Sequence, residues 1–353
     1  MGFLLQDNNS GGYGKIKDCM FNSDTNEKIL PPRPIPSLVE GFNTIAGQIY
    51  IIIFPVVLDL LLWFGPLVRV KNLLLPILER TAELSASAYG EQGTEIMESA
   101  GEMWAVLLDG FNMLFGLRTY PIGVPSLMIG LAAQHNPLGS LRVIEVSSPD
   151  SAVLLVVAFS IAGLLLGSLY YAIVAHAVGG KKERLTFSAL SQFTGQSFLL
   201  SLLVIAAVVM LGFPAMCLIS ALILVFPALG LLPFMILGLM MVWVLLPLAF
   251  TPHGIFMNSL KVGRSMVSSV KMVRSTMSGA GVFFIMIIML SYGLDALWST
   301  PDVESWMLVV GILGHGFITS GLLAATFVYY RDGSEWLEEL IRLNQAPVDT
   351  AKL

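Results

Sequence analysis

The chain has 353 residues, of which 56% are hydrophobic and only 12% are charged, and its mean hydropathy is +0.79. A soluble domain carries about 25% charged residues, so this composition excludes an ordinary soluble protein and indicates a membrane protein. The net charge of -5 argues against nucleic acid as a partner. Cys19 and Cys217 are far apart and match no metal-ligand spacing, so the sequence predicts no disulfide, metal site or cofactor.

The N-terminal residues 1–36 are polar and end in the segment ILPPRPIP. They predict a disordered cytoplasmic tail followed by a stiff, proline-rich lead-in. Ser37 and Glu40 then have the spacing of a capping box, in which the hydroxyl and the carboxylate satisfy the first amides of a helix. The first transmembrane span is therefore expected at 37–64, with Pro55 as a position for a kink and Asp59 near the outer end.

Residues 65–150 form one large loop that is predicted to be extracytoplasmic and helical. Its apolar residues recur at steps of three and four and form one stripe: Met97, Gly101, Trp104, Leu108, Phe111 and Phe115. Its acidic residues gather on the opposite face: Glu91, Glu95, Glu98, Glu102 and Asp109. Such a face is either solvated or a binding surface for a divalent cation, and helical spacing on a rigid rod favours the solvated interpretation.

A second amphipathic helix is expected at 70–88, started or broken at Pro76. The two helices of this insertion are expected to pair with each other or to lie on the lipid headgroups. They are also the predicted place for a protein partner.

Residues 151–331 predict five further spans. The second span, at about Ser151–Val178, carries the GxxxG pattern Gly163–Gly167, which lets helices approach closely. No Asp, Glu, Lys or Arg occurs between Arg184 and Lys261, and this stretch is long enough to cross a bilayer twice. It supplies spans three and four, with the reversal near Phe226–Gly230.

Residues 253–279 have a helical period but are too polar to span. The apolar side is Ile255, Met266, Val270, Val273 and Met277, and the basic side is Lys261, Arg264, Lys271 and Arg274. Such an amphipathic segment suits an anionic membrane surface, so these four basic residues are candidates for contact with anionic lipid.

Spans five and six are expected at about 280–297 and 306–330, joined by a short acidic link. A short charged helix at Ser334–Leu343 is expected within the cytoplasmic tail 332–353. With both termini inside, the inner segments hold all Lys and Arg except Arg69, Lys71, Arg80, Arg118 and Arg142, as the positive-inside rule requires. The predicted fold is therefore an all-α polytopic bundle of six spans with an extracytoplasmic helical insertion.

Three titratable residues within the predicted spans are the candidates for an intramembrane polar site: Asp59, Asp295 and His315. A charged group inside a span is costly, so each needs a partner or a function. The two carboxylates lie near the outer ends of their spans, where they either meet the interface or line an outward-facing vestibule. His315 lies about half-way along span six between glycines, and it is either a packed, hydrogen-bonded histidine or a proton or ligand site.

No enzyme signature occurs: there is no HExxH, GxSxG, Walker A or GxGxxG pattern. No catalytic residue is therefore assigned, and an enzyme is not the expected class.

A resemblance covers about residues 185–340. The basic segment SLKVGRSMVSSVKMVRSTMSGAG, a short link, and the glycine-rich last span with its charged tail, GLLAATFVYYRDGSEWLEEL, resemble multi-span bacterial membrane proteins. These include the membrane domain attached to some glycerophosphodiester phosphodiesterases. The soluble catalytic domain of those enzymes has no counterpart here, so the resemblance implies no phosphodiesterase activity. It implies a prokaryotic cytoplasmic membrane, and the loop 65–150 departs from the pattern.

Two hypotheses of function follow. The first is a non-enzymatic scaffold that organises lipid or protein partners through the outer helices and the inner basic segment, around a dry bundle. The alternative is a transporter or channel subunit, in which Asp59, Asp295 and His315 face one polar path. The sequence does not determine the substrate, the partner or the oligomeric state.

Overall fold

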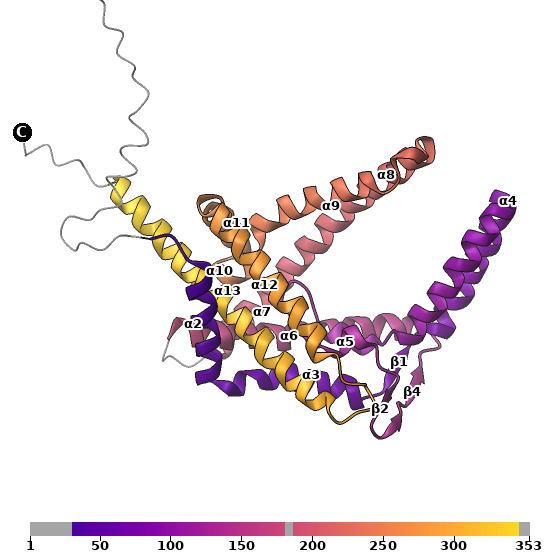
Figure 1. Cartoon of the computed structure of the whole chain (residues 1–353), viewed down its shortest axis with the longest axis horizontal. Helices are drawn as coiled ribbons and strands as arrows, with labels where there is room; N and C mark the ends of the chain where they lie inside the picture. The colour runs from indigo at the N-terminus through magenta and orange to yellow at the C-terminus, as the bar shows by residue number, and fades with distance from the viewer. Residues whose placement is uncertain (1–29, 181–185, 346–353) are drawn as a thin grey trace, which may run out of the picture.

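The computed structural model describes residues 30–180 and 186–345 and shows an all-α architecture with only short strands (Figure 1). The α-helices are α2 (Pro34–Gly47), α3 (Ile53–Phe64), α4 (Lys71–Gly110), α5 (Met128–Leu131), α6 (Pro149–Gly179), α7 (Phe187–Ala207), α8 (Phe213–Val225), α9 (Leu232–Leu245), α10 (Thr251–Asn258), α11 (Val262–Ser275), α12 (Met277–Trp298) and α13 (Leu308–Gln345). The 3-10 and π segments are η1 (Ile49–Ile52), η2 (Met113–Leu117), η3 (Val208–Gly212), η4 (Pro227–Leu229) and η5 (Leu246–Leu248).

Five of these helical stretches are long and apolar enough to cross a membrane, and α2 with α3 make a sixth if that bent pair is one span. The predicted all-α polytopic bundle is thereby confirmed, and the protein is a multi-pass membrane protein. The pair is bent by 91°, which the sequence did not predict. The break lies at Gln48, between α2 and η1, and not at Pro55.

The predicted capping box at Ser37 and Glu40 is wrong. The helix α2 begins three residues earlier, at Pro34, because a proline without an N–H is well suited to the first turn. Ser37 consequently lies within the helix and donates its hydroxyl to the Arg33 carbonyl at 2.9 Å. Glu40 instead pairs with Arg331 of α13, with 2.8 Å between Oε1 and Nη2.

The bent pair follows α13 from the start of this helix as far as Arg331. At the α2 end, Glu40 contacts Arg331, and Gly41 packs directly on the backbone of Ala325. At the α3 end, the Trp63 indole donates to the Val303 carbonyl, just before α13 begins. These contacts run along the apolar first part of α13, which supports α2–α3 as a single broken span.

The insertion 65–150 is built around two small two-stranded sheets and an arm. The strand β1 (Leu67–Arg69) pairs in parallel with β4 (Val143–Glu145), and β2 (His135–Asn136) pairs antiparallel with β3 (Gly139–Ser140). The arm is α4, which projects from the bundle in Figure 1. The structure assigns α4 as one helix and not two, yet Lys71 Nζ lies 2.9 Å from Asp109 Oδ1. A straight helix of that length would span about 60 Å, so α4 doubles back between its ends.

The GxxxG pattern of α6 receives the short 3-10 helix η2 and the loop that follows it, not another spanning helix. A Cβ at Gly163 would lie 2.3 Å from the Leu117 carbonyl oxygen, and one at Gly167 would lie 2.7 Å from the Gly123 Cα. Close approach was correctly expected, but its partner is the segment 111–128 of the insertion. This contact holds that segment against the membrane bundle.

The α7–α8–α9 hairpin is the least packed part of the membrane region. Its reversal lies between α8 and α9, near Phe226–Gly230 as predicted, and it extends away from the bundle in Figure 1. Large apolar side chains cover it on all sides, among them Phe213 and Trp243. A helix that is apolar all round suits the hydrocarbon of a membrane.

The predicted basic segment 253–279 is two helices with different environments. All residues of α10 from Thr251 to Met257 are buried, so this part continues the fourth span and is not interfacial. Only α11 is amphipathic, and its buried face includes Ser265 and Ser269, which had not been assigned to the apolar side. Ser269 accepts from Phe250 N–H at 3.2 Å and donates to the Pro247 carbonyl at 2.7 Å. Ser265 likewise donates to the Thr251 carbonyl at 2.6 Å, so both serines join α11 to the backbone at the α9–α10 break.

The predicted separate helix at Ser334–Leu343 is also wrong, since α13 continues without a break to Gln345. Gly333 does not end the helix. Its missing side chain makes room for the Met272 sulfur, which a Cβ would approach to 2.7 Å. The long helix therefore joins the last span to α11.

Candidate functional site

A cavity of about 340 Å³ lies among α12, α13, α6, α10 and the segment 118–126. Its polar lining residues are Arg118, Thr119, Tyr120, Ser126, Tyr170, Tyr171, His253, Ser291, Asp295, His315, Thr319 and Thr326. Phe284, Ile287, Leu322 and Leu323 supply an apolar wall. The cavity volume is at the lower end of the range for small-molecule sites, so the cavity suits a compact solute.

His315 and Asp295 form a pair on the cavity wall. His315 Nδ1 lies 2.8 Å from Asp295 Oδ1, and the imidazole is almost fully buried whereas the carboxylate is about a third exposed, at 4% and 35%. An ionised Asp295 takes the Nδ1 proton as a hydrogen bond, which leaves Nε2 as the atom that gains or loses a proton. Nε2 is buried and has no hydrogen-bond partner in the described chain. The pair can therefore hold a proton or a ligand group next to the cavity.

The position of His315 differs from the prediction. It lies seven residues after the start of α13 at Leu308, about 10 Å along the helix, and not half-way along the span. Asp295 lies in the last turn of α12. Because α12 and α13 are antiparallel neighbours, these two positions meet at the same depth, near the link 299–307.

Asp59 does not line the cavity but lies behind it. Its side chain is fully buried and accepts from the Ser126 hydroxyl at 2.5 Å and from the Leu127 and Met128 amides. It is also close enough to His315 for the two charges to interact. Asp59 thus fixes the segment 118–128, and with it Ser126, over the cavity. An interfacial, solvated carboxylate was one of the two expectations, and the structure places Asp59 elsewhere.

Arg118 is the cationic residue of the cavity lining. Its guanidinium lies 5.2 Å from the Tyr120 ring centroid and donates to the Ser126 carbonyl at 3.4 Å. In the part of the chain that the structure describes, no carboxylate lies within 4 Å of it. An arginine has several donors in a fixed fork, so this guanidinium keeps donors for a ligand.

His253 marks the deep end of the cavity. Its Nε2 lies 2.7 Å from the Thr326 hydroxyl, and its ring packs 4.4 Å from the Phe327 centroid. His253 thus lines the cavity with an imidazole whose Nε2 is already bonded to Thr326.

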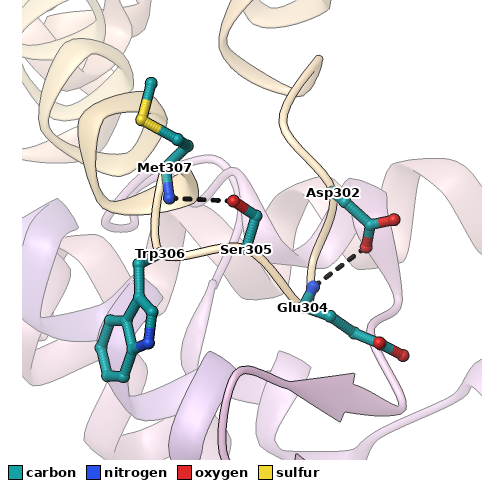
Figure 2. Close-up of a pocket in the computed structure, with 5 residues that line it drawn as sticks. All are labelled: Asp302, Glu304, Ser305, Trp306 and Met307. Carbon is teal, nitrogen blue, oxygen red and sulfur yellow. Dashed lines mark hydrogen bonds between the residues drawn. The ribbon is translucent and has the colours of Figure 1, made fainter.

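A second hollow lies at the link between α12 and α13 and is lined by Asp302, Glu304, Ser305, Trp306 and Met307 (Figure 2). Its polar groups serve local turns: Asp302 Oδ1 accepts from the Glu304 amide, and the Ser305 hydroxyl accepts from the Met307 amide. All its lining residues come from one short segment, so no second wall faces them. This hollow is a surface feature and lacks the enclosure of a binding site.

The four basic residues predicted to contact lipid lie on one exposed face at α11. Lys261, Arg264, Lys271 and Arg274 are all exposed, and no ion pair involves them in the described residues. The buried face of α11 fixes the helix to the bundle, so the four charges point away from it.

The sequence singled out Asp295 and His315 as candidates, and the structure brings the two side chains together. It missed Arg118 and His253 as cavity residues. His253 had a signal, because it is the only titratable side chain besides Cys217 between Arg184 and Lys261. Arg118 had none, since it precedes a proline- and glycine-rich stretch that resembles an ordinary loop.

The cavity lining offers hydrogen-bond donors and acceptors to a ligand. No group of three His, Cys, Asp or Glu residues that could hold a metal occurs in the described residues. The side chains of Glu91, Glu95 and Glu98, part of the predicted acidic face, lie outside the described residues. No serine or threonine hydroxyl is hydrogen-bonded to His315 Nε2 there, so the pair lacks the nucleophile that acyl transfer needs.

Comparisons with protein-family models, with curated proteins and with solved structures find no match for this chain. The resemblance over residues 185–340 therefore stays a prediction. Function is inferred from the geometry of the cavity.

Proposed function

We propose that the protein is a multi-pass transporter for a small solute, with the α12–α13 cavity as its binding site and the His315–Asp295 pair as its proton-binding group. The observation that carries the proposal is the buried, unpartnered Nε2 of His315 on the wall of a polar cavity. A buried polar nitrogen without a partner is costly, and such groups mark functional sites in membrane proteins.

The coupling of solute binding to proton binding follows from the groups around His315. Asp295 accepts from Nδ1, Asp59 lies close behind, and Arg118 faces the same cavity. A proton gained at Nε2 places a positive charge beside these two carboxylates. A solute that enters the cavity meets this charge, and its binding is thereby linked to the proton.

The proposal includes the location and the orientation of the protein in its membrane. The protein lies in a prokaryotic cytoplasmic membrane with both termini and α11 in the cytoplasm, and α4 and the link 299–307 outside. The distribution of Lys and Arg supports this orientation. The cavity, near the link, then lies closer to the outer surface.

The test is solute and proton flux in proteoliposomes, with a panel of ions and small metabolites applied under a pH gradient. We expect flux with the wild type, its loss in His315→Gln, and unchanged flux in His135→Gln, a matched control at an exposed histidine of β2. Flux no greater than in empty liposomes across the whole panel would refute transport. Equal flux in His315→Gln and wild type would refute the role of the pair.

A scaffold is the second candidate, and a different observation favours it. The α4 arm exposes large apolar side chains, including Met103, Trp104, Val106 and Leu107, and α11 exposes its basic face. These surfaces suit a protein partner and anionic lipid. Deletion of 72–108 separates the two candidates, because it removes the arm but no residue of the cavity: a scaffold loses its function, and a transporter keeps its flux.

A further inference from the structure

The cavity contains two opposite charges that do not pair with each other. Arg118 and Asp295 both line it, yet no carboxylate lies within 4 Å of the Arg118 guanidinium in the described chain. Asp295 uses Oδ1 for His315, and no hydrogen bond among the described residues involves Oδ2. Each charged group therefore keeps hydrogen-bonding capacity toward the cavity.

We propose that the cavity binds a small zwitterion with an apolar body, its anionic group held by Arg118 and its cationic group by Asp295. This inference rests on the proposed function, for which it names the substrate class. A carboxylate fits the guanidinium fork, and an ammonium donates to a free carboxylate oxygen.

The separation of charges favours a zwitterion over a simple ion. A lone anion at Arg118 would share the cavity with Asp295, and a lone cation at Asp295 would share it with Arg118. A zwitterion places each of its charges opposite a group of the other sign and leaves the net charge of the site unchanged. Uncompensated charge is expensive away from water, so this neutrality matters within a bundle.

The apolar wall defines the rest of the ligand. Phe284, Ile287, Ser291 and Asp295 follow one face of α12, so this face changes from apolar to polar toward the link. Leu322 and Leu323 of α13 also line the cavity. An aliphatic side chain of a few carbons fills this part, and the volume of about 340 Å³ matches an amino acid or a similar small molecule.

The test compares three probes that share one branched aliphatic chain and differ in the charged groups that they carry. L-leucine is the zwitterion, 4-methylpentanoate is its anion without the amine, and 3-methylbutylamine is its cation without the carboxylate. Binding to the purified full-length protein is measured by isothermal titration calorimetry. We expect L-leucine to bind on the order of 10- to 100-fold more tightly than either analogue, because each analogue loses one charge-assisted hydrogen bond.

Two variants assign the charges to their residues. Arg118→Gln weakens L-leucine on the order of 10- to 100-fold but does not weaken 3-methylbutylamine. Asp295→Asn weakens L-leucine by a similar factor but does not weaken 4-methylpentanoate. Arg142→Gln, at an exposed arginine outside the cavity, is the matched control and leaves all three affinities unchanged.

Several results would overturn the proposal. An anion as tight as L-leucine makes this an anion site, an amine as tight makes it a cation site, and no binding of any probe at millimolar concentration refutes the zwitterion class. The comparison of probes on the wild type does not depend on the variants folding. If flux of another solute depends on His315 while none of these probes binds, only this inference fails; if L-leucine binds but nothing is transported, only the transport function fails.

Discussion

The helix α13 and the α7–α9 hairpin are both apolar enough to span a membrane, yet their surroundings are opposite. More than half of the most apolar stretch of α13 is buried inside the protein, whereas none of the corresponding stretch is buried in either arm of the hairpin. The least apolar of the five spanning helices is thus the most buried, and the most apolar, Phe187–Ile223, is among the least. Within a membrane, high hydropathy identifies the surfaces that face lipid, and small or polar residues identify those that face protein.

The residues of α13 show why. Gly314 lies flat against the Trp298 ring, and Gly321 receives the ring of Phe42. Ser320 accepts the Tyr170 hydroxyl at 2.9 Å. Each of these positions lowers the hydropathy of the helix and each makes a specific contact. The hairpin has no need of such residues, since lipid conforms to any apolar surface.

The largest expected effect comes from removing one aromatic ring on each side of this comparison. Phe283 is fully buried and stacks on Tyr329 at 4.3 Å between ring centroids. Phe283→Ala is expected to lower the free energy of unfolding by about 3–5 kcal/mol. Phe213→Ala, at a residue that is 69% exposed on α8, is expected to cost about 0.5 kcal/mol or less.

Unfolding in mixed micelles by increasing sodium dodecyl sulfate, followed by far-ultraviolet circular dichroism, measures both. Equal losses for the two variants would break the comparison. They would mean that Phe213 is packed against protein, for instance in an oligomer.

Two glycine-to-valine substitutions, one in each region, test the same contrast, because each adds side-chain volume at one position. A Cβ at Gly41 would lie 2.3 Å from the Ala325 backbone nitrogen, so Gly41→Val must push α2 and α13 apart. Overpacking of this kind costs about 1–3 kcal/mol. Gly238 of α9 has nothing within 4 Å of its Cβ position, so Gly238→Val is expected to be neutral within about 0.5 kcal/mol in the same unfolding assay. A stable Gly41→Val protein would show that the broken first span is not held by α13.

The sequence predicted the membrane class and the positions of the spans because hydropathy depends on composition alone. It failed where geometry depends on partners. The 91° bend after α2 has no proline at the break, and beyond it η1 and α3 both pack on α13. The inward serines of α11 were also missed, since an amphipathic pattern assigns polar residues to the outside.

The candidate site was half predictable for a similar reason. Charged residues inside spans are rare, so Asp59, Asp295 and His315 were evident from the sequence. Their roles were not, because Asp59 is bound by a segment about 70 residues away and Asp295 meets His315 only through the α12–α13 packing. Arg118 reaches the cavity because GxxxG glycines of α6 accept its loop, a contact between segments that no local pattern encodes.

The next smaller effect is expected from removing a serine hydroxyl at a buried position, compared with removing one at an exposed position. Ser269→Ala leaves the Phe250 amide and the Pro247 carbonyl without their partner at the α9–α10 break. A buried group that loses its hydrogen bond costs about 1–2 kcal/mol, so we expect a loss of that size. Ser220→Ala, on the exposed surface of α8, is the matched control and is expected to have no measurable effect. If both variants unfold alike, water or lipid headgroups satisfy the break and the serines are dispensable.

The smallest effect is expected on the basic face of α11, the second surface proposed to meet lipid. The hairpin would meet acyl chains through apolar area, whereas Lys271 and Arg274 would meet headgroups through charge, so only the second contact depends on salt. In nanodiscs rich in anionic lipid at low salt, each substitution to alanine is expected to lower the stability by about 1 kcal/mol or less. In zwitterionic lipid or at high salt the loss should vanish. Arg80→Ala, at an exposed arginine of α4, is the control for charge in general. A loss that persists at high salt would assign these residues to packing, and a loss shared by Arg80→Ala would show that the lipid responds to net charge and not to the face of α11.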